Sequence, residues 1–235
     1  MKGIDAEAAA VIFDMDGVLV DTEPVYGDAN RELFNIIGIT VAPEEYESFV
    51  GISADIMWSG LRSRYGLGQS VQKLISMEQN LVLSRIKELP DLSPIAGIPV
   101  LLNALRHMNV PLAVASSSSR ALIDLALAKA NIRSCFDVVV SGFEIPRGKP
   151  APDIFLTAAG LLGANPGNCV VIEDSANGVT GAKAAGMFCV GFHNPNSGCQ
   201  DLSRADMVIK DFSQPAVKKI TALITETERK SYIEL

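Results

Sequence analysis

Short runs of apolar residues, spaced along most of the chain, constrain its fold more than any other feature. The runs are continuously apolar rather than alternating, which is typical of parallel strands covered on both faces. Longer stretches with a helical period separate them. This alternation predicts an α/β protein with a doubly wound, mostly parallel sheet. We expect the strands at residues 10–13, 111–115, 136–140, 169–172, 187–191 and 207–209.

Several helices between these runs have recognisable starts. Ser119 and Ser175 are suited to cap helices, because a serine hydroxyl accepts a hydrogen bond from an unpaired N–H of the first turn. Pro99 and Pro152 fit the first turn of two further helices, where the missing N–H of proline costs nothing. These helices are expected to connect the strands and to cover the sheet.

One segment breaks the alternation. Nearly a hundred residues separate the first two expected strands, far more than one crossover helix needs. The segment has helical periods and no convincing strand. We therefore predict two domains: an α/β core of residues 1–22 and 93–235, and an inserted helical domain of residues 23–92. Residues 66–68 are expected to form a turn within the insert, and residues 90–94 its return linker.

Charge and hydropathy narrow the possible partners. The formal net charge is −7, so the chain repels nucleic acid and anionic lipid over most of its surface. An anionic substrate would need locally concentrated positive charge, which a metal ion commonly supplies. No apolar run is long enough to cross a bilayer, and residues 1–10 lack the pattern of a signal peptide. We expect a cytoplasmic protein without nucleic-acid or membrane partners.

Cysteine and histidine give no sign of zinc or disulfide chemistry. No two cysteines form a C-x-x-C pair, and buried thiols in a reducing compartment are expected. His107 and His193 have no partner at ligand spacing, so neither is assigned a catalytic role. The four cysteines are Cys135, Cys169, Cys189 and Cys199.

Carboxylates follow two of the expected strands, at the edge where a parallel sheet collects its chemistry. Asp14 and Asp16 follow the first run, and Glu173 and Asp174 follow the fourth. Alternate residues of an extended chain point the same way, so Asp14 and Asp16 are expected to share one small volume. Like charges there call for a cation or a shared proton. Oxygen ligands from two strands favour Mg²⁺ over zinc.

A run of serines and one lysine are further candidates for the same site. Ser116 opens four successive serines after the second expected strand, a pattern suited to holding phosphate at a helix N-terminus. Lys149, between Gly148 and Pro150, is expected in a loop over the carboxylates. Each feature has an ordinary alternative: Asp and Gly form turns, Ser caps helices, and Lys lies on surfaces. Their recurrence at the ends of separate strands favours a functional site.

Four motifs in this order resemble the haloacid dehalogenase superfamily, and within it the β-phosphoglucomutase-like phosphatases. The resemblance covers nearly the whole chain. It implies a Rossmann-like core and a mobile helical cap formed by the insert, hinged near residues 21–23 and 92–94. The matching segments are FDMDGVLVDTEP at 13–24, VASSS at 114–118, GKPAPDIF at 148–155 and VIEDSANGV at 171–179.

The resemblance implies a role for each matching residue. Asp14 would attack phosphorus and become an aspartyl phosphate, while Asp16 would protonate the leaving oxygen and then activate water. Magnesium would be held by Asp14, Asp16 through its main-chain carbonyl, and Asp174, with Glu173 as a ligand or just behind the ligands. The phosphoryl oxygens would be held by Ser116, Ser117 and Lys149.

The leaving group would be contacted mainly from the insert. The segment Gly51-Ile52-Ser53 resembles the substrate-facing loop of the family's cap. A hexose phosphate, a phosphorylated sugar acid and a nucleotide-like monoester all remain open as substrates. Tyr26 and Trp58 have an alternative role in the core of the insert. The candidate contacts are Thr22, Glu23, Tyr26, Asn30, the 51–55 loop with Gly51 and Ser53, Trp58, Arg120 and Asn177.

Two other functions compete with a magnesium-dependent phosphatase of small phosphate esters. A sugar phosphate mutase of this family needs a histidine after the Asp-Thr hinge and an arginine in the cap loop, but Tyr26 and Ala54 stand there. A non-catalytic phosphate-binding module would not need the complete polar set. Asp16 argues against dehalogenation, since the dehalogenases lack this second aspartate. We expect a monomeric phosphatase.

Overall fold

Six parallel strands form one sheet within residues 9–49 and 53–224, the part of the chain that the computed structural model describes. The strand order is β3-β2-β1-β4-β5-β6, and every neighbouring pair is parallel. The predicted α/β fold with a doubly wound parallel sheet is confirmed. The strands are β1 (Ala10–Phe13), β2 (Leu112–Ser116), β3 (Val138–Ser141), β4 (Cys169–Glu173), β5 (Phe188–Phe192) and β6 (Met207–Ile209).

The strand limits differ slightly from those expected, at the carboxyl end of β4 and at both ends of β2, β3 and β5. Ser116 pairs with Ser141, and Glu173 pairs with Gly191, so these polar residues belong to the strands rather than following them. The third strand begins later than predicted because Phe136 still belongs to the turn after a short 3₁₀ helix, η1 (Arg133–Cys135).

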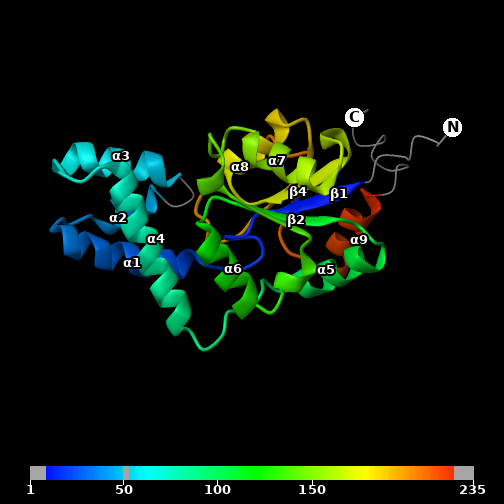
Figure 1. Cartoon of the computed structure of the whole chain (residues 1–235), viewed down its shortest axis with the longest axis horizontal. Coiled ribbons are helices and arrows are strands. Elements are labelled where there is room, and N and C mark those ends of the chain that lie inside the picture. Colours follow the sequence, from blue (N-terminus) through cyan, green and yellow to red (C-terminus); the bar gives the residue numbers. More distant parts are fainter. Residues whose placement is uncertain (1–8, 50–52, 225–235) are drawn as a thin grey trace.

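Five helices cover the two faces of the sheet (Figure 1). Side chains of β1 alternate between the two layers: Val11 and Phe13 pack with one group of helices, Ala10 and Ile12 with the other. The first group is α5 (Ile98–His107), α6 (Arg120–Lys129) and α9 (Gln214–Ala222), and the second is α7 (Asp153–Leu162) and α8 (Ala176–Ala184). Two further 3₁₀ helices are η2 (Gly142–Glu144) and η3 (Pro166–Asn168).

The expected helix starts are found. Ser175 caps α8 through its hydroxyl, which accepts from the N–H of Gly178 at 3.0 Å. Ser119 precedes α6 without such a bond, and Pro152 precedes α7. These caps place the beginnings of α6 and α8 beside the carboxyl ends of β2 and β4.

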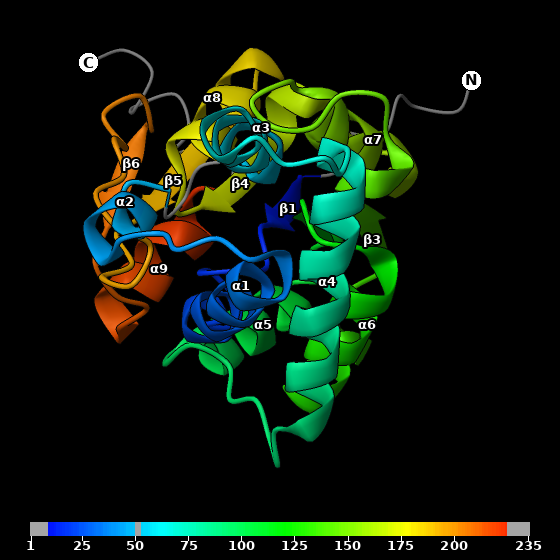
Figure 2. The ribbon, with the colours of Figure 1, turned by 90° about the vertical axis from the view of Figure 1, so that its left-hand side faces the viewer.

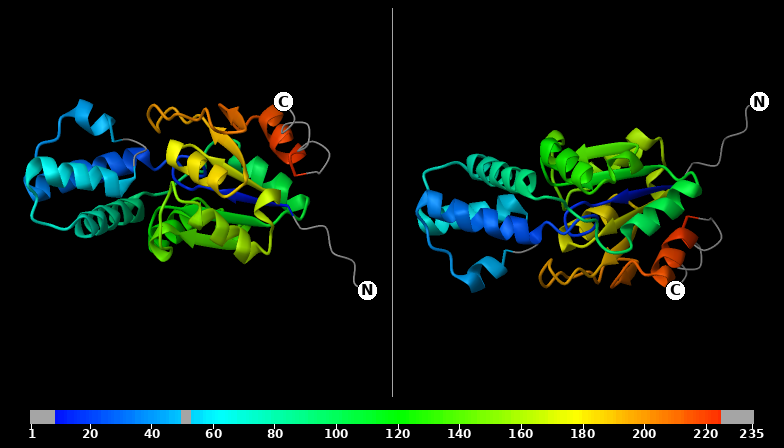
Figure 3. Two further views of the ribbon diagram at one scale, coloured as in Figure 1. Left: turned by 90° about the horizontal axis from the view of Figure 1, so that it is seen from above. Right: turned by 90° about the horizontal axis from the view of Figure 1, so that it is seen from below.

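The described part of the segment between β1 and α5 is helical, as predicted, and lies at one end of the molecule (Figure 3). It contains α1 (Glu23–Ile37), α2 (Pro43–Glu47), α3 (Ala54–Tyr65) and α4 (Val71–Glu88). Trp58 is fully buried in a separate apolar cluster of these helices, whereas the nearby Ile56 is 56% exposed. Its limits as a domain, residues 23–92, stay a prediction.

The insert also contacts the sheet domain. Val82 and Ile86, in the second half of α4, join the apolar cluster under the sheet, and α4 packs beside α6. The two linkers run side by side, because Val20 and Pro94 form an antiparallel bridge. Figure 2 shows α1 to α4 in front of the carboxyl ends of the strands. The insert therefore covers the edge at which the polar residues gather.

Two smaller expectations can be compared with the structure. Cys169 and Cys189 are buried as expected, whereas Cys199 is exposed and Cys135 is half-buried; none of the four is in a disulfide. Among the described residues, no helix combines the length and the apolar character needed to span a bilayer.

Candidate active site

The residues predicted from separate strand ends meet at one cavity of about 190 Å³ between the sheet and the insert. This is smaller than the roughly 300–1,000 Å³ of sites for drug-sized ligands, so a small metabolite fits. From the predicted set, the cavity is lined by Asp14, Asp16, Glu23, Tyr26, Asn30, Ser53, Ser117, Lys149, Glu173, Asp174 and Asn177.

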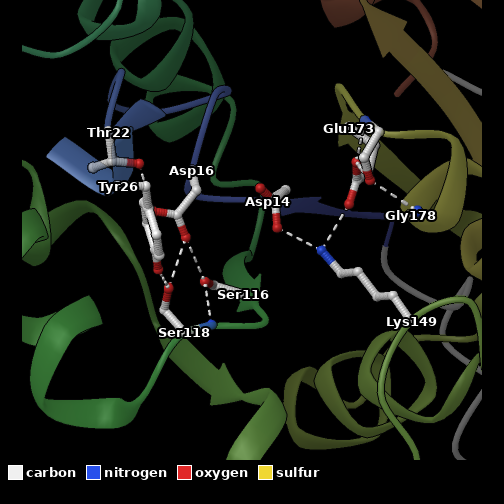
Figure 4. Close-up of polar contacts among 10 residues, drawn as sticks. Asp14, Asp16, Thr22, Tyr26, Ser116, Ser118, Lys149, Glu173 and Gly178 are labelled. Carbon is white, nitrogen blue, oxygen red and sulfur yellow. Dashed lines mark hydrogen bonds and ion pairs between the residues drawn. The ribbon is translucent and has the colours of Figure 1, made fainter. Parts of the chain in front are cut away.

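Lys149 joins the ends of β1 and β4 (Figure 4). Its Nζ donates to Asp14 Oδ1 at 2.5 Å and to Glu173 Oε1 at 2.7 Å. Burial would lower the pKa of Lys149, but the two carboxylates outweigh burial and raise it, so the lysine stays charged. Burial raises the pKa of Asp14 well above its usual value, with Lys149 opposing and Glu173 adding to the rise. One cation thus faces more than one buried carboxylate.

Glu173 is positioned to hold Lys149. While Oε1 accepts from Lys149, Oε2 accepts from the N–H of Ser175 at 2.8 Å and from its hydroxyl at 2.9 Å. The side chain is fully buried against Gly178, where a Cβ atom would come within 1.7 Å of Oε1. Both oxygens therefore have protein partners, and the predicted use of Glu173 as a metal ligand receives no support from this geometry.

Replacing Gly178 with alanine is expected to destabilise the protein by roughly 1–3 kcal/mol, because the new methyl group collides with the Glu173 carboxylate, which cannot move aside without losing its bonds to Lys149 and Ser175. Gly160→Ala is the matched control, since Gly160 also lies within a helix but has nothing within 4 Å of its Cβ position. That control should gain up to about 1 kcal/mol. Chemical denaturation measures both, and equal stability of the two variants would contradict the packing described for Glu173.

Asp14 and Asp174 are the side chains that fit a divalent cation. Burial raises the pKa of Asp174 well above its usual value, and Glu173 and Asp14 raise it further, so Lys149 beside Asp14 compensates the negative charge of the pair only in part. The loop after β1 approaches closely: a Cβ at Gly17 would lie 2.0 Å from Asp174 Oδ2. Within residues 9–49 and 53–224, no three His, Cys, Asp or Glu side chains form a complete ligand set. Two carboxylates, a main-chain carbonyl and outer oxygen ligands would suit Mg²⁺, which keeps several waters.

Asp16 is held by three hydroxyl groups from two segments (Figure 4). Thr22 Oγ1 donates to Oδ1 at 2.6 Å, while Oγ of Ser116 and Oγ of Ser118 donate to Oδ2 at 3.1 and 2.9 Å. Ser116 is fully buried and also accepts from the N–H of Ser118 at 3.0 Å. Thr22 and Ser116 thus position Asp16 in this structure and do not line the cavity.

Tyr26 connects the insert to this group. Its hydroxyl bonds to Ser118 Oγ at 2.8 Å and accepts from Gln79 Nε2 at 3.1 Å. Gln79 Oε1 in turn accepts from the N–H of Ser119 at 3.0 Å. Burial raises the pKa of Tyr26 well above its usual value, and Asp16 adds to the rise, so the phenol stays protonated. A hydrogen-bonded chain therefore runs from α4 through Tyr26 to Asp16.

Some predicted contacts lie elsewhere. Arg120 forms a surface ion pair with Glu144 at 2.5 Å and does not line the cavity, so the structure gives it no place near a leaving group. Trp58 is packed inside the insert, behind the cavity wall. Gly51 lies outside the described residues, and among the described members of the 51–55 loop Ser53 and Ala54 line the cavity. His107 and His193 are not among the lining residues.

Several site residues were missed from the sequence. Ser197 donates to Asp174 Oδ2, and Asn194 Nδ2 donates to the carbonyl of Gly17 at 2.9 Å. Both follow β5, so the same strand-end argument could have found them. Ser118 belongs to the serine run that was singled out. Glu78 and Gln79 lie on α4, and no local pattern distinguishes them from solvent-facing residues of an amphipathic helix.

Known proteins resemble this chain in sequence and in fold. A family model described as haloacid dehalogenase-like hydrolase matches residues 8–186. Validoxylamine A 7'-phosphate phosphatase of Streptomyces hygroscopicus subsp. limoneus is 30% identical, over 86% of this chain and 93% of its own. β-Phosphoglucomutase of Bacillus subtilis (strain 168) is 32% identical, over 87% and 90%. The crystal structure of β-phosphoglucomutase from Clostridium difficile superposes with a TM-score of 0.79 at 27% identity, covering 97% of this chain and all of that one.

Proposed function

The chain belongs to the haloacid dehalogenase-like hydrolases and is a phosphoric monoester hydrolase, and from this premise we propose a magnesium-dependent phosphatase that acts through an aspartyl phosphate. Its substrates would be phosphate monoesters of sugars or related small metabolites, as the name of the Streptomyces relative suggests. The observation that supports this best is the buried Asp14 carboxylate, which lies 2.5 Å from Lys149 at the floor of the cavity.

The proposed reaction has two steps on one nucleophile. Asp14 attacks phosphorus, the bond from phosphorus to the ester oxygen breaks, and Asp16 gives that oxygen a proton. Asp16 then takes a proton from water as the water attacks the aspartyl phosphate, which returns Asp14 and releases phosphate. Lys149 keeps Asp14 oriented and faces the phosphoryl charge. Asp16 must leave its present hydroxyl partners to do this, and the Ser118 bond to Tyr26 ties that movement to the insert.

Asp14 and Asp174, with the carbonyl of Asp16, would hold Mg²⁺. When bound, the cation offsets the repulsion between these carboxylates and a phosphate dianion. We further propose that Ser117 and the buried Ser116 help to hold phosphoryl oxygens once Asp16 has turned away. The insert of residues 23–92 would act as a cap that excludes bulk water from the cavity.

A phosphatase is favoured over a mutase by the residues at the insert side of the cavity. A mutase must bind its substrate by a second phosphate, which calls for a cation such as arginine. Ala54 lines the cavity at the position where the family's mutases carry that arginine. Among the described lining residues, the only Lys or Arg is Lys149, and it is engaged by Asp14 and Glu173.

Turnover of p-nitrophenyl phosphate tests the proposal. We expect hydrolysis with Mg²⁺ and loss of nearly all activity after chelation with EDTA, restored by added Mg²⁺. A parallel assay follows β-glucose 1-phosphate with a bisphosphate primer, where we expect phosphate release rather than glucose 6-phosphate. Absence of turnover with Mg²⁺, Mn²⁺ and Co²⁺ would favour a phosphate-binding module instead, and accumulation of glucose 6-phosphate would favour the mutase.

We also propose that the enzyme is a cytoplasmic monomer. The absence of disulfides among its four cysteines suits a reducing compartment. Sedimentation at micromolar concentration would test the monomer, with a mass near 25.0 kDa expected.

A further inference from the structure

A buried carboxylate faces the cavity from the insert, opposite Asp14 and Lys149. Glu78 lies on α4 and lines the cavity, yet only 2% of its surface is exposed. Burial raises the pKa of Glu78 to about 7, and the neighbouring side chains of Asn30 and Trp58 offset only part of that rise. A carboxylate in such a place lowers stability when it ionises, whereas an apolar residue of similar size would not.

A buried acceptor atom beside Glu78 has no hydrogen-bond partner among the described groups. The acceptor is the buried Oδ1 of Asn30, a residue that lines the cavity, whereas the indole of Trp58 does not line the cavity and acts as a hydrogen-bond donor toward Glu78. The side-chain nitrogen Nδ2 of Asn30 donates to Tyr46 Oη at 3.2 Å. An unpaired buried acceptor beside a substrate-facing carboxylate indicates a place prepared for a ligand, because an orphaned polar group is otherwise costly.

The charges of the cavity wall restrict what that ligand can be. Glu23, on α1, also faces the cavity, and burial together with Asp16, Asp21 and Glu78 raises its pKa to about 7. The rest of the insert wall is apolar or uncharged, including Phe49 and Met57. A leaving group with a second acidic group would meet carboxylates here and no described cation to balance it.

We propose that Glu78 is a specificity-determining residue that accepts a hydrogen bond from a hydroxyl or ammonium group of the leaving group and repels leaving groups carrying a second phosphate or a carboxylate. The inference rests on the proposed phosphatase function and narrows its substrate class to polyhydroxylated or amino-bearing phosphate esters with one acidic group. Of the substrates left open by the sequence, phosphorylated sugar acids are thereby disfavoured. Asn30 is the second contact, through its unpaired Oδ1.

Four esters that share one carbon skeleton test this at pH 8, above the pKa of about 7 to which burial raises Glu78 and Glu23, so that both side chains are largely ionised. They are glucose 6-phosphate, glucosamine 6-phosphate, 6-phosphogluconate and glucose 1,6-bisphosphate, which carry a neutral, cationic, carboxylate or second phosphate group. Because 6-phosphogluconate is also open-chain, the change in its ratio on Glu78→Gln assigns the effect to charge. We expect kcat/KM for the first two to exceed that for the last two by at least about 10-fold. In Glu78→Gln the ratio between glucose 6-phosphate and 6-phosphogluconate should fall by about 10-fold, mainly through KM.

Glu88→Gln is the matched control, because Glu88 is an exposed carboxylate at the far end of the same helix. It should leave every ratio as in the wild type. An unchanged ratio in Glu78→Gln, or a wild type that accepts 6-phosphogluconate as readily as glucose 6-phosphate, would overturn the role of Glu78. A loss of rate that is equal for all four esters would also overturn it, since it would mark a structural role only.

Measurements of ester binding distinguish a failure of this inference from a failure of the proposed function. Dissociation constants of the four esters are measured with Mg²⁺ in an Asp14→Asn background, with Glu78 or with Gln at that position. The same order of preference, lost in the double variant, would support Glu78 even if the wild-type protein hydrolysed none of the esters. That result would contradict the proposed phosphatase function but support the role of Glu78 in selectivity. Equal affinities for all four esters would overturn the selectivity, whatever the wild type hydrolyses.

Discussion

Asp14→Asn is expected to lower kcat by at least ~10⁴-fold, because an amide cannot take the phosphoryl group. The structure also predicts that this loss is not caused by unfolding. Burial and neighbouring carboxylates raise the pKa of Asp14, so a neutral amide of the same shape relieves unfavourable charge. Lys149 keeps Glu173 as its partner at 2.7 Å. Phosphate release from p-nitrophenyl phosphate and thermal unfolding in metal-free buffer measure the two effects.

A large loss of kcat without a loss of stability is diagnostic for a nucleophile that is surrounded by other carboxylates. The melting temperature of Asp14→Asn should equal or exceed that of the wild type without metal. Retention of more than about a hundredth of the wild-type kcat would refute Asp14 as nucleophile, given the size of effect expected from losing the attacking group. A large fall in melting temperature would show instead that the Asp14–Lys149 contact serves mainly to hold the fold.

Asp16→Asn is expected to lower kcat by roughly 10²–10⁴-fold while leaving substrate affinity nearly unchanged. The two steps should be affected differently. p-Nitrophenolate leaves without a proton, so the first step with p-nitrophenyl phosphate needs Asp16 little, whereas hydrolysis of the aspartyl phosphate still needs it. The variant should therefore show a burst of p-nitrophenol and accumulate phosphorylated Asp14. An alkyl phosphate, whose leaving group needs the proton, should show no burst.

Rapid-quench kinetics and mass spectrometry of the quenched protein make this comparison. Thr22→Val is a useful companion, because it removes one of the three hydroxyl donors to Asp16 and leaves the carboxylate in place. It should lower kcat much less than Asp16→Asn and give no burst. Equal losses with both esters and no phosphorylated protein would contradict the role of Asp16 in the second step.

The sheet and the floor of the site could be predicted from the sequence because both follow from local rules. A parallel strand buried on both faces must be apolar throughout, which made β1, β2 and β4 visible. Side chains at the carboxyl ends of such strands share one edge, which brought Asp14 and Asp174 to one cavity without knowledge of the tertiary structure. The roles assigned to them remain proposals.

The insert side of the cavity, opposite the strand ends, could not be predicted in the same way. Glu78 and Gln79 face the cavity only because α4 packs on α1 and beside α6, and this orientation depends on tertiary contacts. The same reason explains the misplacement of Arg120, whose guanidinium pairs with Glu144 rather than turning toward the cavity. Glu173, expected as a ligand or just behind the ligands, packs against Gly178 of the same VIEDSANGV segment, and its contact with Lys149 depends on how the loop that carries Lys149 folds over β4.

The relatives include both phosphatases and mutases, so names alone do not decide the reaction. The insert wall distinguishes them through its charge, since a second phosphate needs a cation there and the described wall offers Glu23 and Glu78. Specificity in such a cavity depends on repulsion as much as on attraction. The core residues would then supply the chemistry while α1, α3 and α4 select the ester.

A crystal structure of the protein with Mg²⁺ and beryllium fluoride, which mimics a phosphorylated aspartate, tests the central claim most directly. The account predicts fluoroberyllate bonded to Asp14, its fluorides facing Lys149, and one cation touching Asp14, the carbonyl of Asp16 and Asp174. Fluoroberyllate on another residue, or a cation that does not touch both Asp14 and Asp174, would contradict it.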